Sequence, residues 1–189
     1  DRAVFGWSGG DRWSGRELWV TDGTLAGTHQ LIDLLPEGSS SPHDFVHVNG
    51  KTVFSAFTAL ISYGTYVPQY WVTDGTVQGT TVIKDLYPGE LHFTRTFASF
   101  SDHFVFGASH IGGHDLWSTD ATEAGTHLLA SFVDIGSTHG DDFATIGNSV
   151  LFDADDGIHG HELWISDGTA AGTRLVKDIN PSGGGIVTV

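Results

Sequence analysis

Short stretches of alternating apolar and polar residues recur along the whole chain, separated by segments rich in glycine, aspartate and threonine. Examples are "TVFSAF" at 52–57 and "SVLFDA" at 149–154. Alternation of this kind, with β-branched and aromatic residues, predicts short strands. No segment keeps a helical period over several turns, so the pattern predicts an all-β protein.

One pattern of twelve residues occurs four times, each copy centred on a tryptophan. The copies are "ELWVTDGTLAGT" at 17–28, "QYWVTDGTVQGT" at 69–80, "DLWSTDATEAGT" at 115–126 and "ELWISDGTAAGT" at 162–173. Their tryptophans are 52, 46 and 47 residues apart, at Trp19, Trp71, Trp117 and Trp164. Each copy predicts a strand that enters a tight turn, because Asp-Gly supplies positive φ. An alternating stretch, such as "HQLIDL" at 29–34, follows each turn.

Each repeat is expected to hold four strands, A to D, joined in a meander. The twelve residues supply strand C and the turn into strand D, while "NGK" at 49–51 and "GNS" at 147–149 connect A to B. Four antiparallel strands repeated every ~40–50 residues are typical of a propeller blade. The repeats therefore predict a four-bladed β-propeller.

The predicted propeller occupies residues 1–189 as a single domain. Its blades are expected at 1–35 together with 185–189, at 43–88, at 92–135 and at 141–180. The first repeat lacks strand A, and "GIVTV" at 185–189 would supply it, closing the ring and covering an exposed edge. Half of a larger ring made by two chains is the alternative, so a monomer or a homodimer is expected.

The repeat resembles the ELWxxDGT repeat family, found in large bacterial proteins that are mostly secreted or surface-associated. The match is specific in the first and last copies; Gln69 and Asp115 replace the glutamate in the other two, and Ala121 replaces one turn glycine. The resemblance implies a propeller-type fold and an extracellular or cell-surface location, without an activity. The repeated residues are expected to be structural, as are the aspartates that end the D strands, Asp33, Asp85, Asp134 and Asp178.

The charge and composition of the chain argue against some classes of binding partner and some kinds of chemistry. Lys and Arg number 8 against 23 Asp and Glu, which gives a formal net charge of −15. Such a chain repels phosphate backbones and anionic lipid, which argues against nucleic-acid and membrane-surface binding. There is no cysteine, so thiolate chemistry is excluded, and the apolar runs are too short for membrane insertion.

The B–C and D–A loops are longer than the other turns and differ between repeats, which indicates where binding residues lie. Aromatic and polar side chains in them suit a carbohydrate or a protein partner. The candidate ligand-binding residues are Trp7, Asp11, Arg12, Trp13, Tyr63 and Tyr66. For Trp7, packing against a neighbouring blade is the competing interpretation.

A metal site is the alternative function. Three loop histidines, His43, His92 and His139, could converge on zinc or copper. The segment "DADDGIHGHE" at 153–162 faintly resembles a calcium loop, with candidate ligands Asp153, Asp155, Asp156 and Glu162. Its spacing is not that of an EF-hand, and a turn rich in Asp and Gly is the favoured interpretation. His159 and His161 could also face one way on a strand, but position 161 aligns with Arg16 and His114 as a polar position of the repeat.

Catalysis is the least favoured function. "GWSGG" at 6–10 matches G-x-S-x-G, but no helix follows to form a nucleophile elbow. The sequence contains no HExxH, P-loop or GxGxxG motif. We therefore expect a non-catalytic binding or interaction module that uses its B–C and D–A loops.

Overall fold

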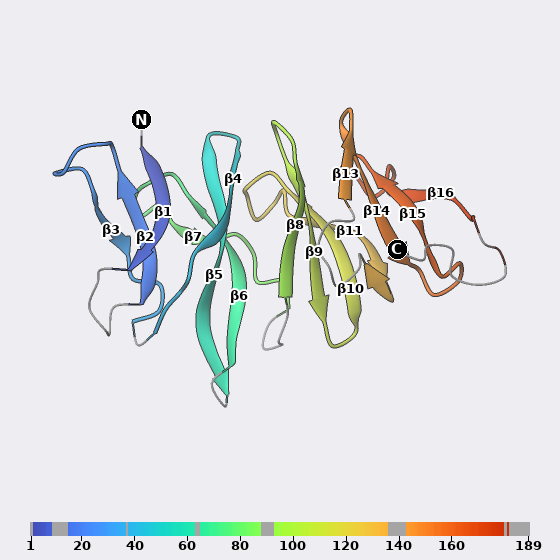
Figure 1. The fold of residues 1–189 in the computed structure, drawn as a ribbon, viewed down its shortest axis with the longest axis horizontal. Coiled ribbons are helices and arrows are strands. Elements are labelled where there is room, and N and C mark those ends of the chain that lie inside the picture. The colour runs from blue at the N-terminus through green and yellow to red at the C-terminus, as the bar shows by residue number, and fades with distance from the viewer. Residues whose placement is uncertain are drawn as a thin grey trace. The chain divides into compact units, whose positions relative to one another are not determined.

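A computed structural model describes most of the chain, namely residues 2–8, 15–36, 38–62, 65–87, 93–135, 143–179 and 181. The described residues form strands and turns without a helix (Figure 1), which confirms the prediction of an all-β protein. Within this part of the chain there is consequently no helix with the length and apolar character needed to span a bilayer.

The strands form four antiparallel sheets that follow one another along the chain. The first sheet contains β1 (Ala3–Ser8), β2 (Arg16–Thr21) and β3 (His29–Ile32). The second contains β4 (His43–Val48), β5 (Lys51–Ser62), β6 (Thr65–Thr73) and β7 (Thr81–Val82). The third contains β8 (Phe93–Ser99), β9 (Phe104–His110), β10 (Gly113–Thr119) and β11 (His127–Phe132).

The fourth sheet has five strands, one more than the second and third sheets. It contains β13 (Phe143–Ile146), β14 (Ser149–Asp155), β15 (His161–Ser166) and β16 (Arg174–Lys177), and β12 (Asp134–Ile135) also pairs with β14. Consecutive strands are neighbours in the first three sheets and from β13 to β16 in the fourth, which confirms the predicted meanders. The strand expected at 185–189 lies outside the described residues, so closure of a ring stays a prediction.

The sheets belong to two compact units. The first unit comprises residues 1–94 and 121–123, and the second comprises residues 95–120 and 124–189. In the first unit, Leu18 and Val20 of β2 share a buried cluster with Phe54 and Ala56 of β5. In the second unit, an equivalent cluster joins the third and fourth sheets, with Phe152 of β14 fully buried in it. Each unit is therefore a pair of sheets with its own apolar core.

The repeated tryptophans, which the sequence predicted to be structural, are half-buried. Trp164 packs edge to face against Phe132 of β11, with ring centroids 5.0 Å apart and planes at 83°. Its Nε1 has no hydrogen-bond partner. The indole thus covers the core from the side, and its other surface stays in contact with solvent.

The turn between strands C and D explains the repeated Asp-Gly-Thr. Asp22 Oδ1 accepts hydrogen bonds from the N–H of Thr24 at 2.9 Å and from its hydroxyl at 2.7 Å. The N–H of Gly27 then donates to Thr24 Oγ1 at 2.9 Å. The hydroxyl of Thr24 lowers the pKa of Asp22. Equivalent bonds around Asp74 and Asp167 show that this turn is built alike in three repeats.

The repeated glutamate fixes the chain beyond the last strand of its sheet. Glu17 is buried, and its Oε2 accepts a hydrogen bond from the N–H of Leu34 at 3.0 Å. The N–H and hydroxyl of Ser40 also donate to this carboxylate, at 2.8 and 2.5 Å. Glu162 is fully buried and accepts from the N–H of Ile179 at 3.0 Å. Both glutamates thus bind a backbone N–H two residues beyond the end of strand D.

Close packing inside the turn requires glycine at its second glycine position. A Cβ on Gly27 would lie 2.0 Å from Asp22 Oδ1. We expect Gly27→Ala to lower the free energy of unfolding by about 1–3 kcal/mol, the usual cost of overpacking. Urea denaturation measures this, and the loss should shrink when Gly27→Ala is made in an Asp22→Ala background. An equal loss in both backgrounds would show that the carboxylate is not the cause.

The buried glutamate can be tested by an isosteric change. In Glu17→Gln, an amide NH₂ would face the N–H donors of Leu34 or Ser40, so we expect a loss of about 1–3 kcal/mol in the free energy of unfolding. The exposed Glu123 is the matched control, and Glu123→Gln should change stability by less than about 0.5 kcal/mol. Equal stability of the two variants in urea denaturation would contradict the structural role of Glu17.

Candidate functional site

The variable loops of the second unit lie along one edge of its sheets. In a meander, the B–C and D–A connections are at one end of the strands, and the A–B and C–D turns are at the other. Figure 1 shows the β9–β10 turn and the β14–β15 loop at the same end, opposite the β13–β14 turn. We call residues 110–114, 133–135 and 155–161 the loop edge of the second unit.

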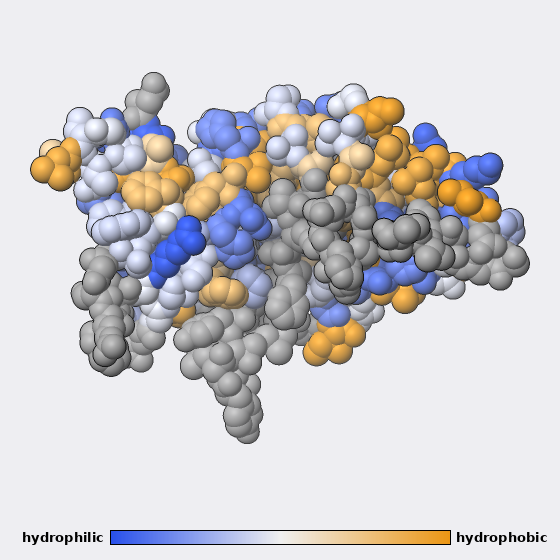
Figure 2. Space-filling view, in the orientation of Figure 1, coloured by the Kyte–Doolittle hydropathy of each residue, from blue (hydrophilic) through white to orange (hydrophobic). Residues whose placement is uncertain are grey.

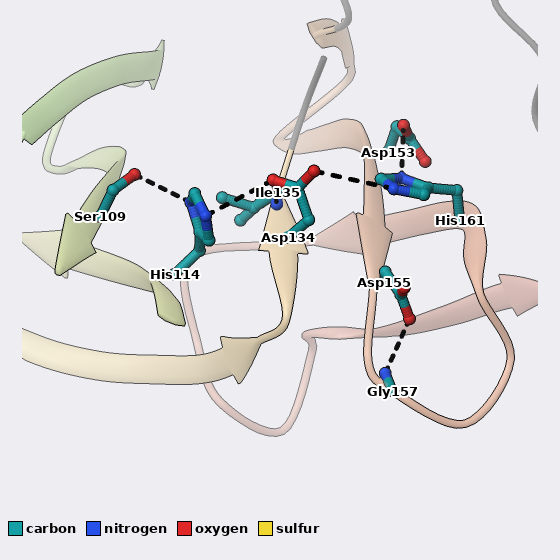
Figure 3. Close-up of polar contacts among 8 residues, drawn as sticks. All are labelled: Ser109, His114, Asp134, Ile135, Asp153, Asp155, Gly157 and His161. Atoms are coloured by element: carbon teal, nitrogen blue, oxygen red, sulfur yellow. Dashed lines mark hydrogen bonds and ion pairs between the residues drawn. The ribbon is translucent and has the colours of Figure 1, made fainter. Parts of the chain in front are cut away.

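Beside this loop edge, five polar side chains form a continuous chain of contacts (Figure 3). Ser109 Oγ and His114 Nδ1 are hydrogen-bonded at 2.8 Å, and His114 Nε2 lies 3.5 Å from Asp134 Oδ1. The other oxygen of Asp134 lies 3.7 Å from His161 Nε2. His161 Nδ1 is hydrogen-bonded to Asp153 Oδ2 at 3.1 Å. One carboxylate therefore lies between two imidazoles.

The repeat brings these side chains together. His114 and His161 are both three residues before the repeated tryptophan, at the start of strand C in consecutive repeats. Asp134 follows β11 of the third sheet, but it is in β12, which pairs with β14 of the fourth sheet. The N–H of Val133 secures this crossing by donating to the Asp155 carbonyl at 2.8 Å. Asp134 is thereby held between the two histidines.

Asp134 binds neighbouring backbone, as predicted, and it also contacts two histidines. Its Oδ1 accepts a hydrogen bond from the N–H of Ile135 at 2.8 Å, as expected for an aspartate that ends strand D. Its position between His114 and His161 was not predicted. Local sequence patterns do not show it, because it depends on pairing between strands of different repeats.

A charge pattern in the sequence also marks this region. Residues 96–173 contain neither Lys nor Arg, whereas they contain 12 Asp and Glu and 7 His. Histidine is therefore the only residue type in this stretch whose side chain can become positive. A count of Lys and Arg along the sequence would have identified residues 96–173 as a stretch without either residue.

The Ser109–His114–Asp134 order resembles a nucleophile, base and acid. Acyl transfer also needs hydrogen-bond donors aimed at the developing oxyanion. In the neighbouring turn, the N–H of Gly112 donates to His110 Nδ1 at 3.1 Å, so this donor is already engaged. The contacts from Ser109 to Asp153 form a polar link between the third and fourth sheets.

The structure does not bring the four calcium candidates together. Asp155 Oδ1 accepts from the N–H of Gly157 at 2.7 Å, and Asp156 Oδ1 accepts from the N–H groups of Ile158 and His159 at 2.9 Å. Glu162 is buried and bound to backbone, and Asp153 is paired with His161. Throughout the described residues, no group of three or more His, Asp or Glu is placed to hold a metal ion.

The candidates for zinc or copper are only partly described. His43 is exposed, with its Nδ1 hydrogen-bonded to the Ser41 carbonyl at 2.8 Å and its Nε2 4.0 Å from Asp44 Oδ2. His92 and His139 lie outside the described residues. The three-histidine site therefore stays a prediction.

Among the candidate ligand-binding residues, Trp7 is the best described. It is 48% exposed and packs edge to face on Trp19 of the same sheet, with centroids 4.9 Å apart. Half of its ring is thus free for a ligand. Tyr66 lies in β6. The other candidates, Asp11, Arg12, Trp13 and Tyr63, lie outside the described residues.

Comparison with known proteins leaves the family open. No protein-family model matches the chain, and no curated protein matches it significantly. Among solved structures, the chain is similar to a crystal structure of TolB from Acinetobacter baumannii, at 13% identity and a TM-score of 0.47. The match covers 92% of this chain and 39% of that one. Likeness at this level does not establish a shared function.

The loop edge also contains a histidine whose titration can be tested. Burial raises the pKa of Asp156, but hydrogen bonds from His159 and Ile158 outweigh this, and the pKa lies below its ordinary value. The same hydrogen bond to Asp156 raises the pKa of His159. The pair therefore stabilises the fold fully between the unfolded aspartate pKa of about 3.9 and the unfolded histidine pKa of about 6.5. This stabilisation is lost as pH rises through the raised pKa of His159, and also as pH falls through the lowered pKa of Asp156.

We expect the NMR titration midpoint of His159 to fall in Asp156→Asn. This variant keeps an oxygen for the backbone N–H groups and removes the charge. Asp102→Asn, a change in the turn between β8 and β9, should leave the midpoint of His159 in place. If the midpoint does not move in Asp156→Asn, the hydrogen bond of His159 to Asp156 is not what raises its pKa.

Proposed function

We propose that this chain is a non-catalytic interaction module that binds a protein partner through the B–C and D–A loops of its sheets. The observation that carries the proposal is a pair of isoleucines at the tips of consecutive B–C connections. Ile111 is 86% exposed and Ile158 is 81% exposed. Figure 2 shows apolar surface at the tip of the β9–β10 turn.

These isoleucines are part of a mixed apolar and polar surface. Each is three residues before the histidine that approaches Asp134, so the repeat places them at matching points. Val133 is also exposed, and it lies beside the β14–β15 loop, where a Cβ on Gly157 would be 3.1 Å from its Cγ2. Apolar side chains beside polar groups that are already hydrogen-bonded are the usual composition of a protein interface.

The described loops favour a protein over a carbohydrate. Sugar rings are bound by exposed aromatic faces, and the exposed apolar side chains at the loop edge of the second unit are aliphatic. Trp7 offers one half-exposed ring in the first unit. Carbohydrate binding is therefore the alternative that a binding experiment should include.

The proposal includes a closed four-bladed propeller as the scaffold, with residues 185–189 as the fourth strand of the first sheet. Its support is the number of strands. The first sheet has three strands among the described residues, whereas the second and third sheets have four. A strand added to β1 would cover its open edge. An extracellular or cell-surface location belongs to the same proposal and rests on the resemblance of the repeat.

The binding function can be tested by selecting ligands for the immobilised chain from a random peptide library and from a glycan array. We expect peptides to be selected, and we expect the double variant Ile111→Ser with Ile158→Ser to bind them at least about tenfold more weakly, because each buried isoleucine contributes about 1.5–3 kcal/mol. Surface plasmon resonance measures the change.

Ile146→Ser is the matched control. Ile146 is 60% exposed, but it is the last residue of β13, next to the A–B turn of the fourth sheet and at the other end of the strands. Its substitution should leave binding unchanged. Selection of glycans only, or equal weakening by Ile146→Ser, would contradict the proposal.

A further inference from the structure

The loop edge of the second unit lacks permanent positive charge. The stretch from 96 to 173 contains neither Lys nor Arg, and the basic residues that flank it are Arg95 in β8 and Arg174 in β16. Asp134 has 44% of its side chain exposed at this edge. A partner would therefore meet carboxylates and isoleucines, without a competing Lys or Arg from this stretch.

The histidines at this edge are already paired with carboxylates. His110 Nε2 lies 3.5 Å from Asp115 Oδ2, and His159 Nδ1 lies 2.8 Å from Asp156 Oδ2. His114 and His161 share Asp134. The residues of the loop edge include Asp134, Asp155 and Asp156 but no Lys or Arg, so this edge is acidic.

We propose that the loop edge of the second unit binds a basic protein segment in which lysine or arginine alternates with large apolar residues. This inference rests on the proposed function and names the chemistry of the partner. The apolar residues of the segment would cover Ile111, Val133 and Ile158, and its cations would approach Asp134 and Asp155. Complementary charge would speed association and exclude acidic partners.

Other classes of partner fit this surface less well. Metal ions need several converging ligands, and the described part of the chain has no group of three or more His, Asp or Glu placed to hold one. Nucleic acid and anionic lipid are repelled by the same carboxylates. A basic peptide needs only separate contacts along a surface, which the exposed Ile and partly exposed Asp side chains of this edge supply.

Histidine protonation should weaken this binding. Ser109 of β9 and Asp134 of β12 face His114, and Asp134 and Asp153 of β14 face His161. Near His159, the charged groups are Asp156, Glu162 and Asp178. Every charged group named here is a carboxylate, so each added proton reduces the negative charge that a basic segment would meet.

The test uses two synthetic peptides, KLKGKLK and its charge-reversed counterpart ELEGELE, with the full chain in isothermal titration calorimetry at low salt. We expect the lysine peptide to bind at pH 7.5, at least about tenfold more tightly than the glutamate peptide, and to bind more weakly at pH 5.5. Equal binding of the two peptides, or tighter binding at pH 5.5, would overturn the inference.

Two charge variants locate the site. Asp134→Asn and Asp155→Asn keep an oxygen for their backbone N–H donors, and each should weaken the lysine peptide about twofold to fivefold, as expected for partly exposed charge pairs. Asp102→Asn is the control, because Asp102 is more exposed, at 72%, but lies in the turn between β8 and β9 at the other end of the strands. Equal weakening by Asp102→Asn would mean that only overall charge matters, which would overturn the site.

The outcome also separates this inference from the proposed function. If library peptides bind at Ile111 and Ile158 but carry no excess of Lys or Arg, the interaction module stands and the basic partner is wrong. If no peptide depends on the loop edge, both are wrong.

Discussion

Buried carboxylates determine where the chain leaves the last strand of a sheet. A buried carboxylate is costly unless hydrogen-bond donors reach it, so backbone N–H groups must come to Glu17 and Glu162. In both repeats the donor is two residues beyond strand D, which fixes the start of the D–A connection. In the third repeat Asp115 replaces the glutamate, and the chain beyond β11 forms β12 against β14. The third repeat thus differs from the first and fourth both in this acid, near the start of strand C, and in the path of the chain after strand D.

The strands and their connecting turns were predictable because their signals are local. Period-two alternation and Asp-Gly turns specify the meanders, and the turn at Asp22 shows why the same residues recur. The half-burial of Trp164 was not predictable, because it depends on Phe132 from another sheet. The same limit applies to Asp134, whose approach to two histidines requires β12 to pair across repeats. In contrast, the absence of Lys and Arg from residues 96–173 can be read directly from the sequence.

The residues that repeat and the residues that vary lie at opposite ends of the strands. Repeated Asp and Thr side chains accept hydrogen bonds from backbone N–H groups at one end of the strands, where the turns are alike. The other end carries exposed isoleucines and histidine–carboxylate pairs, which the sheets do not need for their hydrogen bonds. A rigid scaffold with one varied edge is the usual arrangement of a binding module. In the proposed function, the acidity of the chain would then favour a basic partner.

The central claim, that one edge of the second unit is the binding surface, is tested most directly by hydrogen–deuterium exchange with and without a bound basic peptide. The account predicts slower exchange of backbone amides at 110–114, 133–135 and 155–161 when the peptide is bound, with no change in the C–D turn at 167–173. Protection spread over both ends of the strands, or confined to the C–D turn, would contradict it.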